Sequence, residues 1–247
     1  MVKKIFIDNN GNKIAGVLHE PKTKTDKIVI ISHGFTSDKD RPRHITIAEL
    51  LANNGFAVLR FDFGGCGESY ESSVTVSGEI EDLNSVIGFV KKQGYTKIGL
   101  IGNSLGGLVS LKVYSDVIKS MVLLASVTQG ADRLANILAQ EKVSMENFEK
   151  QGYFIKTRRG RTFKIKKEYF EERKKVNQKE LLSRVKCPVL IIHGTEDKSV
   201  PLEASKLAMN YLSKDSELKI IKGADHHLEI VHGIDKMALD WFKRYLK

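Results

Sequence analysis

The sequence predicts an α/β fold in which a mostly parallel, eight-stranded sheet has helices on both faces. Three observations lead to this fold class. Apolar runs without polar alternation, such as residues 28–31, are typical of strands that are buried on both faces of a parallel sheet. Segments with apolar residues at helical spacing, such as residues 43–53, follow these runs. A serine flanked by glycines, Ser104, stands where one such strand meets the next helix.

The expected elements follow one another in a regular order. Residues 4–8 and 13–19 form an antiparallel hairpin around Asn9-Asn10-Gly11-Asn12. The next strands are expected at 28–31, 56–61, 97–101 and 120–125, and the helices that follow them at 43–53, 77–93 and 105–115. Towards the end, strands at 188–192 and 217–221 alternate with helices at 202–212 and 234–246. This alternation brings the carboxyl ends of the parallel strands to one edge, where open α/β sheets hold their sites.

The alternation stops between residues 128 and 184. This stretch carries its own aromatic residues, so we interpret it as a cap inserted into a core of residues 1–127 and 185–247. Within the cap we expect helices at 131–140, 144–150, 167–175 and 178–183, and a hairpin of residues 152–157 with 162–166. Its aromatic side chains either line a substrate pocket, for which Tyr153, Phe154 and Tyr169 are the candidates, or form a small core of the cap.

The chain carries a formal net charge of +10, and the expected cap hairpin is strongly basic. Between Lys150 and Lys167 the sequence has no acidic residue. A cationic rim there would attract carboxylated or polysaccharide-linked substrates, but the simpler interpretation, which we favour, is a solvated hairpin face. No Cys/His finger or RRM-type aromatic signature accompanies the charge, so no nucleic-acid partner is expected.

The number of cysteines and the N-terminal sequence indicate the cellular compartment of the protein. Cys66 and Cys187 are the only cysteines, which excludes a disulfide framework of the secreted kind. The N-terminus begins like a signal peptide, but Asp8 ends its apolar run after three residues. No run approaches the roughly 18 apolar residues of a membrane span. We therefore expect a soluble, cytoplasmic protein without a membrane partner, and a homodimer is compatible with the sequence.

The strongest motif is Gly102-Asn103-Ser104-Leu105-Gly106, which matches G-x-S-x-G. An apolar strand leads into the motif and a helix leads out, so the chain must turn sharply at Ser104 and expose its hydroxyl. Glycines let the neighbouring backbone approach closely, and the N-terminus of the helix favours negative charge near the hydroxyl. This context predicts a nucleophile rather than a serine that merely caps a helix.

A serine nucleophile needs a base, and the base needs a carboxylate that orients it. Among the histidines after Ser104, His193 ends a strand and is expected to pack or to hold a loop. His226 follows the last strand, at the expected edge of the sheet, and is our candidate base. Asp197 follows the preceding strand and is the candidate orienting acid, with Glu196 as the alternative.

An oxyanion hole requires two backbone N–H groups that point at the developing negative charge. Leu105, the residue after the nucleophile, is expected to supply one of them. Phe35 is expected to supply the other from the loop His33-Gly34-Phe35, and its ring is a candidate substrate contact. This mechanism requires no metal ion and no organic cofactor.

The order and spacing of these elements resemble the α/β-hydrolase superfamily over nearly the whole chain. The elements are His33-Gly34-Phe35, the turn at residues 62–69, the Ser104 motif, Asp197 and His226. Within that superfamily the chain resembles the bacterial cinnamoyl (feruloyl) esterases, through its HGF loop, G-x-G-x-S turn, GNSLGG and GADHH motifs and the inserted hairpin. The resemblance implies hydroxycinnamoyl ester substrates, an insertion that covers the acyl pocket, and catalysis by His226 rather than His227. The chain departs from members with glutamine after the serine, because Leu105 stands there.

We therefore expect a serine carboxylic ester hydrolase that forms an acyl-enzyme with small aryl or alkyl esters. Monoglyceride lipases and general carboxylesterases share most of these motifs, and a monoacylglycerol lipase, a thioesterase or a peptidase on the same scaffold stays open as an alternative. A non-catalytic binding protein on the same fold is a further alternative, against which the complete set of Ser104, Asp197 and His226 argues.

Overall fold

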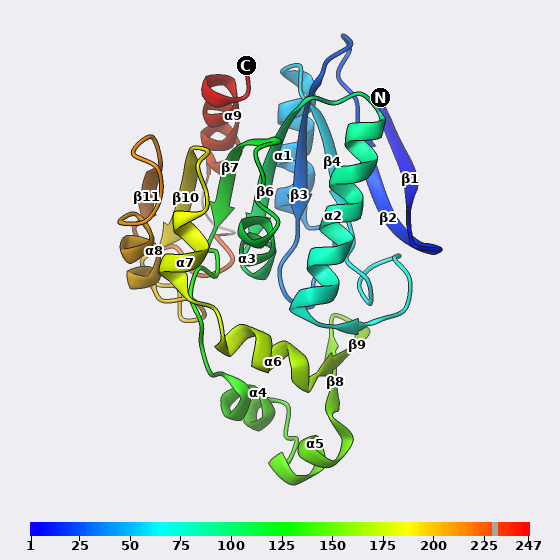
Figure 1. The fold of residues 1–247 in the computed structure, drawn as a ribbon, viewed down its shortest axis with the longest axis vertical. Helices are drawn as coiled ribbons and strands as arrows, with labels where there is room; N and C mark the ends of the chain where they lie inside the picture. The colour runs from blue at the N-terminus through cyan, green and yellow to red at the C-terminus, as the bar shows by residue number, and fades with distance from the viewer. Residues whose placement is uncertain (229–231) are drawn as a thin grey trace.

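The computed structural model describes residues 1–228 and 232–247, and Figure 1 shows the fold. Eight strands form one sheet in the order β1-β2-β4-β3-β6-β7-β10-β11, which confirms the predicted sheet. The strands are β1 Val2–Asn9, β2 Asn12–His19, β3 Lys27–Ser32, β4 Ala57–Phe61, β6 Lys97–Asn103, β7 Ile118–Leu124, β10 Val189–Gly194 and β11 Glu217–Ile221. Every residue of β4 is buried, which the sequence leads one to expect for its four apolar residues but not for Arg60.

The sheet is mixed, because β2 runs antiparallel to both of its neighbours, β1 and β4. The other neighbouring strands of the described sheet are parallel. The prediction confined antiparallel pairing to the first hairpin, and the structure extends it to the β2–β4 pair. The tight turn between β1 and β2 requires only that these two strands oppose each other, and in the structure β2 is the one that opposes the parallel strands.

Helices cover both faces of the sheet, as predicted (Figure 1). On one face, α1 (Pro42–Asn53) and α9 (Ile234–Tyr245) share an apolar cluster with the strands. On the other face, α2 (Val76–Lys92), α3 (Leu105–Lys112) and α7 (Gln178–Ser183) form the second cluster, to which α8 (Leu202–Ala208) adds Ala208. Both α3 and α8 end a few residues before their predicted ends, because i→i+3 turn bonds follow their last residues.

A group of elements between β7 and β10 lies beyond the carboxyl ends of the strands (Figure 1). It consists of α4 (Leu134–Gln140), α5 (Met145–Gln151), β8 (Tyr153–Arg158), β9 (Arg161–Lys166) and α6 (Lys167–Lys174). The strands β8 and β9 form the predicted hairpin, which we call the β8–β9 hairpin. Strand β9 also pairs in parallel with β5 (Ser73–Val74), which the sequence did not predict because two residues carry no periodicity.

No helix in residues 1–228 or 232–247 is both long enough and apolar enough to cross a membrane.

Candidate active site

Ser104 occupies a strained turn between β6 and α3. Its backbone has φ 52° and ψ −113°, in the positive-φ region that residues other than glycine rarely adopt. The Ser104 N–H donates to the carbonyl of Leu124 at 2.9 Å, and the Ser104 carbonyl accepts from the N–H groups of Val127 and Gly107 at 3.0 and 3.1 Å. These bonds hold the turn at the carboxyl edge of the sheet.

The glycines around Ser104 are needed for close backbone contacts. A Cβ atom on Gly102 would lie 2.5 Å from the Cα of Gly107. A Cβ atom on Gly106 would lie 2.4 Å from the carbonyl oxygen of His33. A side chain at either position would therefore push the turn away from its neighbours, which agrees with the reason for glycine given from the sequence.

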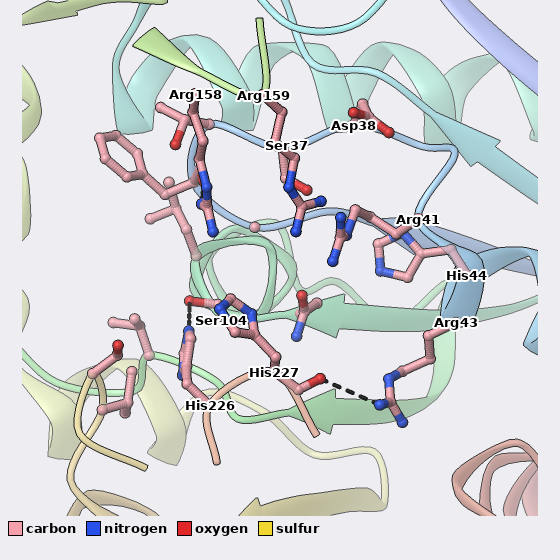
Figure 2. A pocket seen from close by; sticks show the side chains of 18 of the residues that line it. Ser37, Asp38, Arg41, Arg43, His44, Ser104, Arg158, Arg159, His226 and His227 are labelled. Atoms are coloured by element: carbon pink, nitrogen blue, oxygen red, sulfur yellow. Dashed lines mark hydrogen bonds between the residues drawn. The ribbon is translucent and has the colours of Figure 1, made fainter. Parts of the chain in front are cut away.

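The structure brings Ser104, His226 and Asp197 together from three distant parts of the chain. The Nε2 atom of His226 lies 3.0 Å from the Oγ of Ser104 (Figure 2). Its Nδ1 atom lies 2.8 Å from the Oδ2 of Asp197. Both distances are within hydrogen-bonding range, so the imidazole can take a proton from the serine while the carboxylate holds its other nitrogen.

Asp197 is held as a carboxylate by the groups around it. Its side chain is fully buried, and burial alone would raise the pKa. Hydrogen bonds from His193, His226 and the Val200 N–H outweigh burial and hold the pKa of the Asp197 carboxyl well below its usual range. The carboxylate is therefore ionised at neutral pH and can stabilise an imidazolium at His226.

His193 supports the acid loop, which is the role expected from its position at the end of β10. Its Nε2 lies 3.0 Å from the carbonyl of Val200 and 3.1 Å from the Oδ2 of Asp197. Its Nδ1 lies 2.7 Å from the hydroxyl of Ser205 on α8. The ring thereby joins β10, the acid loop and α8.

The loop that carries His226 is held by its neighbours on both sides. The Oδ1 atom of Asp225 accepts the N–H groups of His227 and Leu228, both at 3.0 Å. Arg43 donates to the carbonyl oxygens of the same two residues, and Figure 2 shows the bond to His227. The His227 side chain is exposed, so of the two adjacent histidines His226 is the one bonded to Ser104. Glu196, the alternative acid, is likewise exposed.

The two expected oxyanion donors flank Ser104. Within the described part of the chain, no hydrogen bond is donated by the backbone N–H of Phe35 or Leu105. A Cβ atom on Gly34 would lie 3.2 Å from the Cβ of Ser104, so the loop after β3 passes directly over the serine. Both N–H groups are thus available to an oxygen atom bound beside the hydroxyl.

His33 holds this loop, a role that the sequence analysis did not assign. Its Nδ1 lies 2.9 Å from the Gly34 carbonyl, and its Nε2 accepts the N–H of Phe63 at 3.1 Å. Burial lowers the pKa of His33, so the ring is neutral with its proton on Nδ1. This tautomer satisfies both bonds and ties the loop to the end of β4.

A partly buried ion cluster around Lys39, which lies in the same loop between β3 and α1, was also missed from the sequence. The Lys39 Nζ lies 2.9 Å from Asp62, 2.7 Å from Glu68 and 3.0 Å from Asp40. The Lys39 side chain is 2% exposed and that of Asp62 is fully buried. Arg60 donates to the Lys39 carbonyl at 2.6 Å. A lysine inside a polar loop sequence gives no sign of burial, so the pattern of residues could not have revealed this cluster.

Ser104 opens into a cavity of about 1180 Å³. Among the expected substrate contacts, Phe35 and Tyr169 line it, and their rings stack with centroids 4.7 Å apart. Tyr153 and Phe154 do not line it, which corrects the prediction for these two residues. The ring of Phe154 packs edge-on against Phe148, in an aromatic cluster of the inserted elements, and Tyr153 lies under the Lys164 ammonium at 4.1 Å. For Phe154 the small-core alternative therefore applies.

The order of the strands, the antiparallel strand β2 near one edge of the sheet and the strained turn at Ser104 define the chain as an α/β-hydrolase. Residues 23–184 match the family described as "Serine aminopeptidase, S33", and the chain belongs to that family. The resemblance to esterases of this superfamily that we stated from the motifs is thereby confirmed.

Solved structures and curated relatives agree with this assignment. Est1E from Butyrivibrio proteoclasticus, solved with ferulic acid bound, is 26% identical with a TM-score of 0.77 and 97% of this chain and 99% of that chain covered. The esterase domain of a Rhodothermus marinus protein is 25% identical with a TM-score of 0.76 and 100% of both chains covered. Palmitoyl-protein thioesterase ABHD10 of Mus musculus is 25% identical over 84% of this chain and 71% of its own length. The chain is thus an enzyme of the esterase and related hydrolase class.

Proposed function

We propose that this chain is a serine carboxylic ester hydrolase that works through an acyl-enzyme on Ser104. The observation that carries the proposal is the hydrogen-bonded series from Asp197 through His226 to Ser104, at 2.8 and 3.0 Å. Such a series activates a hydroxyl that would otherwise be a poor nucleophile.

In the first half-reaction, His226 takes the hydroxyl proton as the Ser104 Oγ attacks the ester carbonyl. The negative charge that develops on the carbonyl oxygen is stabilised by the N–H groups of Phe35 and Leu105. His226 then gives its proton to the leaving alkoxide, and the acyl group stays on Ser104. Asp197 stays ionised throughout and stabilises the imidazolium.

In the second half-reaction, water takes the place of the alcohol. His226 removes a proton from the water as its oxygen attacks the acyl carbon, and the same two N–H groups stabilise the charge. Collapse of the intermediate breaks the bond to the Ser104 Oγ, which recovers its proton from His226. The acid is released and the resting site is restored without any cofactor.

We assign substrate binding to the inserted elements. As part of this proposal, residues 128–184 form a cap on a core that consists of residues 1–127 and 185–247. Two aromatic rings support it, because Tyr169 of the insertion stacks on Phe35 of the oxyanion loop inside the cavity. Aromatic walls suit aryl acyl groups, and ferulic acid bound to Est1E supports a hydroxycinnamoyl or other small aryl or alkyl ester.

A thioesterase is the second candidate, because a relative named as a palmitoyl-protein thioesterase matches most of the chain. The same two half-reactions apply, with a thiolate as the leaving group. A panel of methyl ferulate, a monoacylglycerol, a peptide amide and an acyl-CoA, compared by kcat/KM, separates these activities. A cytoplasmic location and a homodimer stay predictions.

The test of the proposal is the Ser104→Ala variant assayed with 4-nitrophenyl butyrate. We expect turnover to vanish while the thermal unfolding curve keeps its shape. Ser115→Ala is a matched control, since the Ser115 side chain is exposed after α3, and it should keep full activity. A fluorophosphonate probe should label the wild type at Ser104. Unchanged hydrolysis by Ser104→Ala would contradict the proposal, and failure of the wild type to label would favour a non-catalytic protein.

A further inference from the structure

The β8–β9 hairpin has an unusual distribution of charge between its two faces. Directly paired residues share a face, and three pairs form one side of the hairpin. These pairs are Phe154 with Ile165, Lys156 with Phe163, and Arg158 with Arg161. Since Phe154, Phe163 and Ile165 are buried, this side faces the interior of the molecule. The cations of this side therefore share the inward face.

The opposite side of the hairpin faces solvent and contains an apolar residue. Ile155 lies there and is 51% exposed, whereas Arg158 on the inward side is partly buried. Arg158 thus departs from the usual pattern of a half-buried hairpin, in which charges face water, whereas Lys164 and Lys166 follow it. The solvated-face interpretation that the sequence favoured therefore suits Lys164, whereas Arg158 and Arg161 line the cavity, Arg161 with 46% of its side chain exposed.

The turn of the hairpin adds a third arginine to this group. Arg159 and Gly160 form the two-residue turn with φ values of 52° and 73°, the positive pair that a tight hairpin turn requires. Figure 2 shows Arg158 and Arg159 reaching from the hairpin into the space on the hydroxyl side of Ser104, with Arg41 beside them. Arg41, Arg158 and Arg159 all line the cavity.

The positive charge that the hairpin brings to this cavity is only partly neutralised. Arg158, Arg159 and Arg161 line the cavity, and Lys156 beside them is paired with Glu141. Arg161 lies 3.7 Å from Asp38. Arg158 donates only to the Phe35 carbonyl, at 3.3 Å, and Arg159 has no hydrogen-bond or ionic partner among the residues described. Like charges gathered in a recess repel one another, so a bound anion would relieve their repulsion.

We propose that Arg158 and Arg159 bind an anionic group of the substrate, so that this enzyme prefers esters or thioesters that carry a carboxylate or a phosphate. The inference rests on the proposed hydrolase function and names its substrate class. Guanidinium groups suit both anions, because their paired N–H donors match two oxygens of either one.

The contact between Arg158 and the Phe35 carbonyl places the anion site beside the oxyanion loop. A substrate anion held there belongs to the same molecule as the ester carbonyl over Ser104. Binding the anion would therefore also orient the carbonyl, which raises kcat as well as lowering KM.

Two matched substrate pairs test the proposal and distinguish the two anions. For a carboxylate, 4-nitrophenyl hydrogen adipate is compared with its uncharged methyl ester. For a phosphate, butyryl-CoA is compared with S-butyryl-N-acetylcysteamine, which has the same thioester without phosphates. We expect kcat/KM for the charged member of one pair to exceed that for its neutral partner by about ten- to a hundred-fold, the range for one or two charge-assisted hydrogen bonds. Added NaCl should reduce this preference.

Variants connect the preference to the two arginines. In the double variant Arg158→Gln with Arg159→Gln, the charged-to-neutral ratio should fall at least about ten-fold. Any disturbance of the oxyanion loop affects both members of a pair equally and cancels in the ratio. Lys166→Gln removes a charge from the same hairpin at an exposed position outside the cavity and should leave the ratio unchanged. Absence of a preference in both pairs, or a preference that survives the double variant, would overturn the proposal.

A binding measurement separates this inference from the proposed function. Adipate and inorganic phosphate are titrated into the Ser104→Ala protein, with and without the two arginine substitutions. Binding of either anion that is lost with the arginines supports the site even if the wild type hydrolyses none of the esters. Binding of neither anion contradicts the site even if 4-nitrophenyl butyrate is hydrolysed.

Discussion

Replacing Asp197 by asparagine tests how the acid loop controls the proton on His226. The Oδ1 atom of Asp197 accepts the N–H groups of Ser199 and Val200, both at 2.8 Å. If the asparagine placed its NH2 group there, this donor would face the N–H groups of Ser199 and Val200, which are also donors. Each buried group left unsatisfied would cost about 1–3 kcal/mol. The amide oxygen therefore keeps the Oδ1 position, and the NH2 group faces His226.

This orientation changes the tautomer of His226. With a donor at 2.8 Å from its Nδ1, the ring must accept there and carry its proton on Nε2. A protonated Nε2 cannot take the hydroxyl proton of Ser104. By analogy with a serine triad of another fold, kcat should fall about ten-thousand-fold, equivalent to about 5 kcal/mol of transition-state stabilisation.

The assay is hydrolysis of 4-nitrophenyl butyrate by Asp197→Asn, with thermal unfolding as a measure of the fold. Asp225→Asn is the matched control in the neighbouring loop. Asp225 is exposed and its Oδ1 accepts two N–H groups, so an asparagine can turn its NH2 group to water and keep both bonds. Its kcat should stay within about five-fold of wild type, since no group at Ser104 changes. An Asp197→Asn enzyme within ten-fold of wild type would refute the reasoning about the tautomer.

Three further predictions concern the loop over Ser104 and the buried charges. Gly34→Ala puts a methyl group 3.2 Å from the Ser104 Cβ, so we expect kcat to fall roughly ten-fold as the oxyanion donor shifts by tenths of an ångström. Gly88→Ala in α2 is its control, where nothing lies within 4 Å, and it should keep activity and add about 0.5–1 kcal/mol of stability. Lys39→Met leaves the Asp62 carboxylate buried without its ammonium, and urea unfolding should show a loss of about 3–5 kcal/mol; a loss below 1 kcal/mol would contradict this. Burial lowers the pKa of His44 from 6.5 to about 3, so the unfolded chain binds a proton that the folded one does not, and stability should fall as the pH drops from 6.5 towards 3. At pH 4.5 this loss is on the order of 2–3 kcal/mol, and a His44→Gln variant should show a shallower pH dependence of its unfolding midpoint in calorimetry.

Much of the fold could be predicted, because its strands obey simple rules. A continuous apolar run such as residues 28–31 of β3 is buried when helices cover both faces of the sheet, so its pattern indicates a parallel sheet. The two-residue strand β5 could not be predicted, since it exists only through its pairing with β9. The exact ends of α3 and α8 depend on local turn bonds rather than on periodicity.

The candidate triad could be named from the sequence because each member follows a strand at the same edge of the sheet. The groups that support the triad could not be named from the sequence. The Lys39 cluster and the His33 bonds join segments that are far apart in sequence, and no spacing rule connects them. Tyr153 and Phe154 were misassigned because adjacent residues of a strand point to opposite sides, and neither side at that position reaches the cavity.

The pairing of β9 with β5 has a mechanical consequence for the β8–β9 hairpin. Strand β9 pairs with residues 73–74, which precede α2, and the Glu172 carboxylate of α6 accepts the Val76 N–H at 2.7 Å. The β8–β9 hairpin and α6 are therefore attached to this segment at two points, and moving them away from it would break both attachments. Because both are tied to the same short segment, residues 73–76, a displacement of that segment would move both of them relative to Ser104.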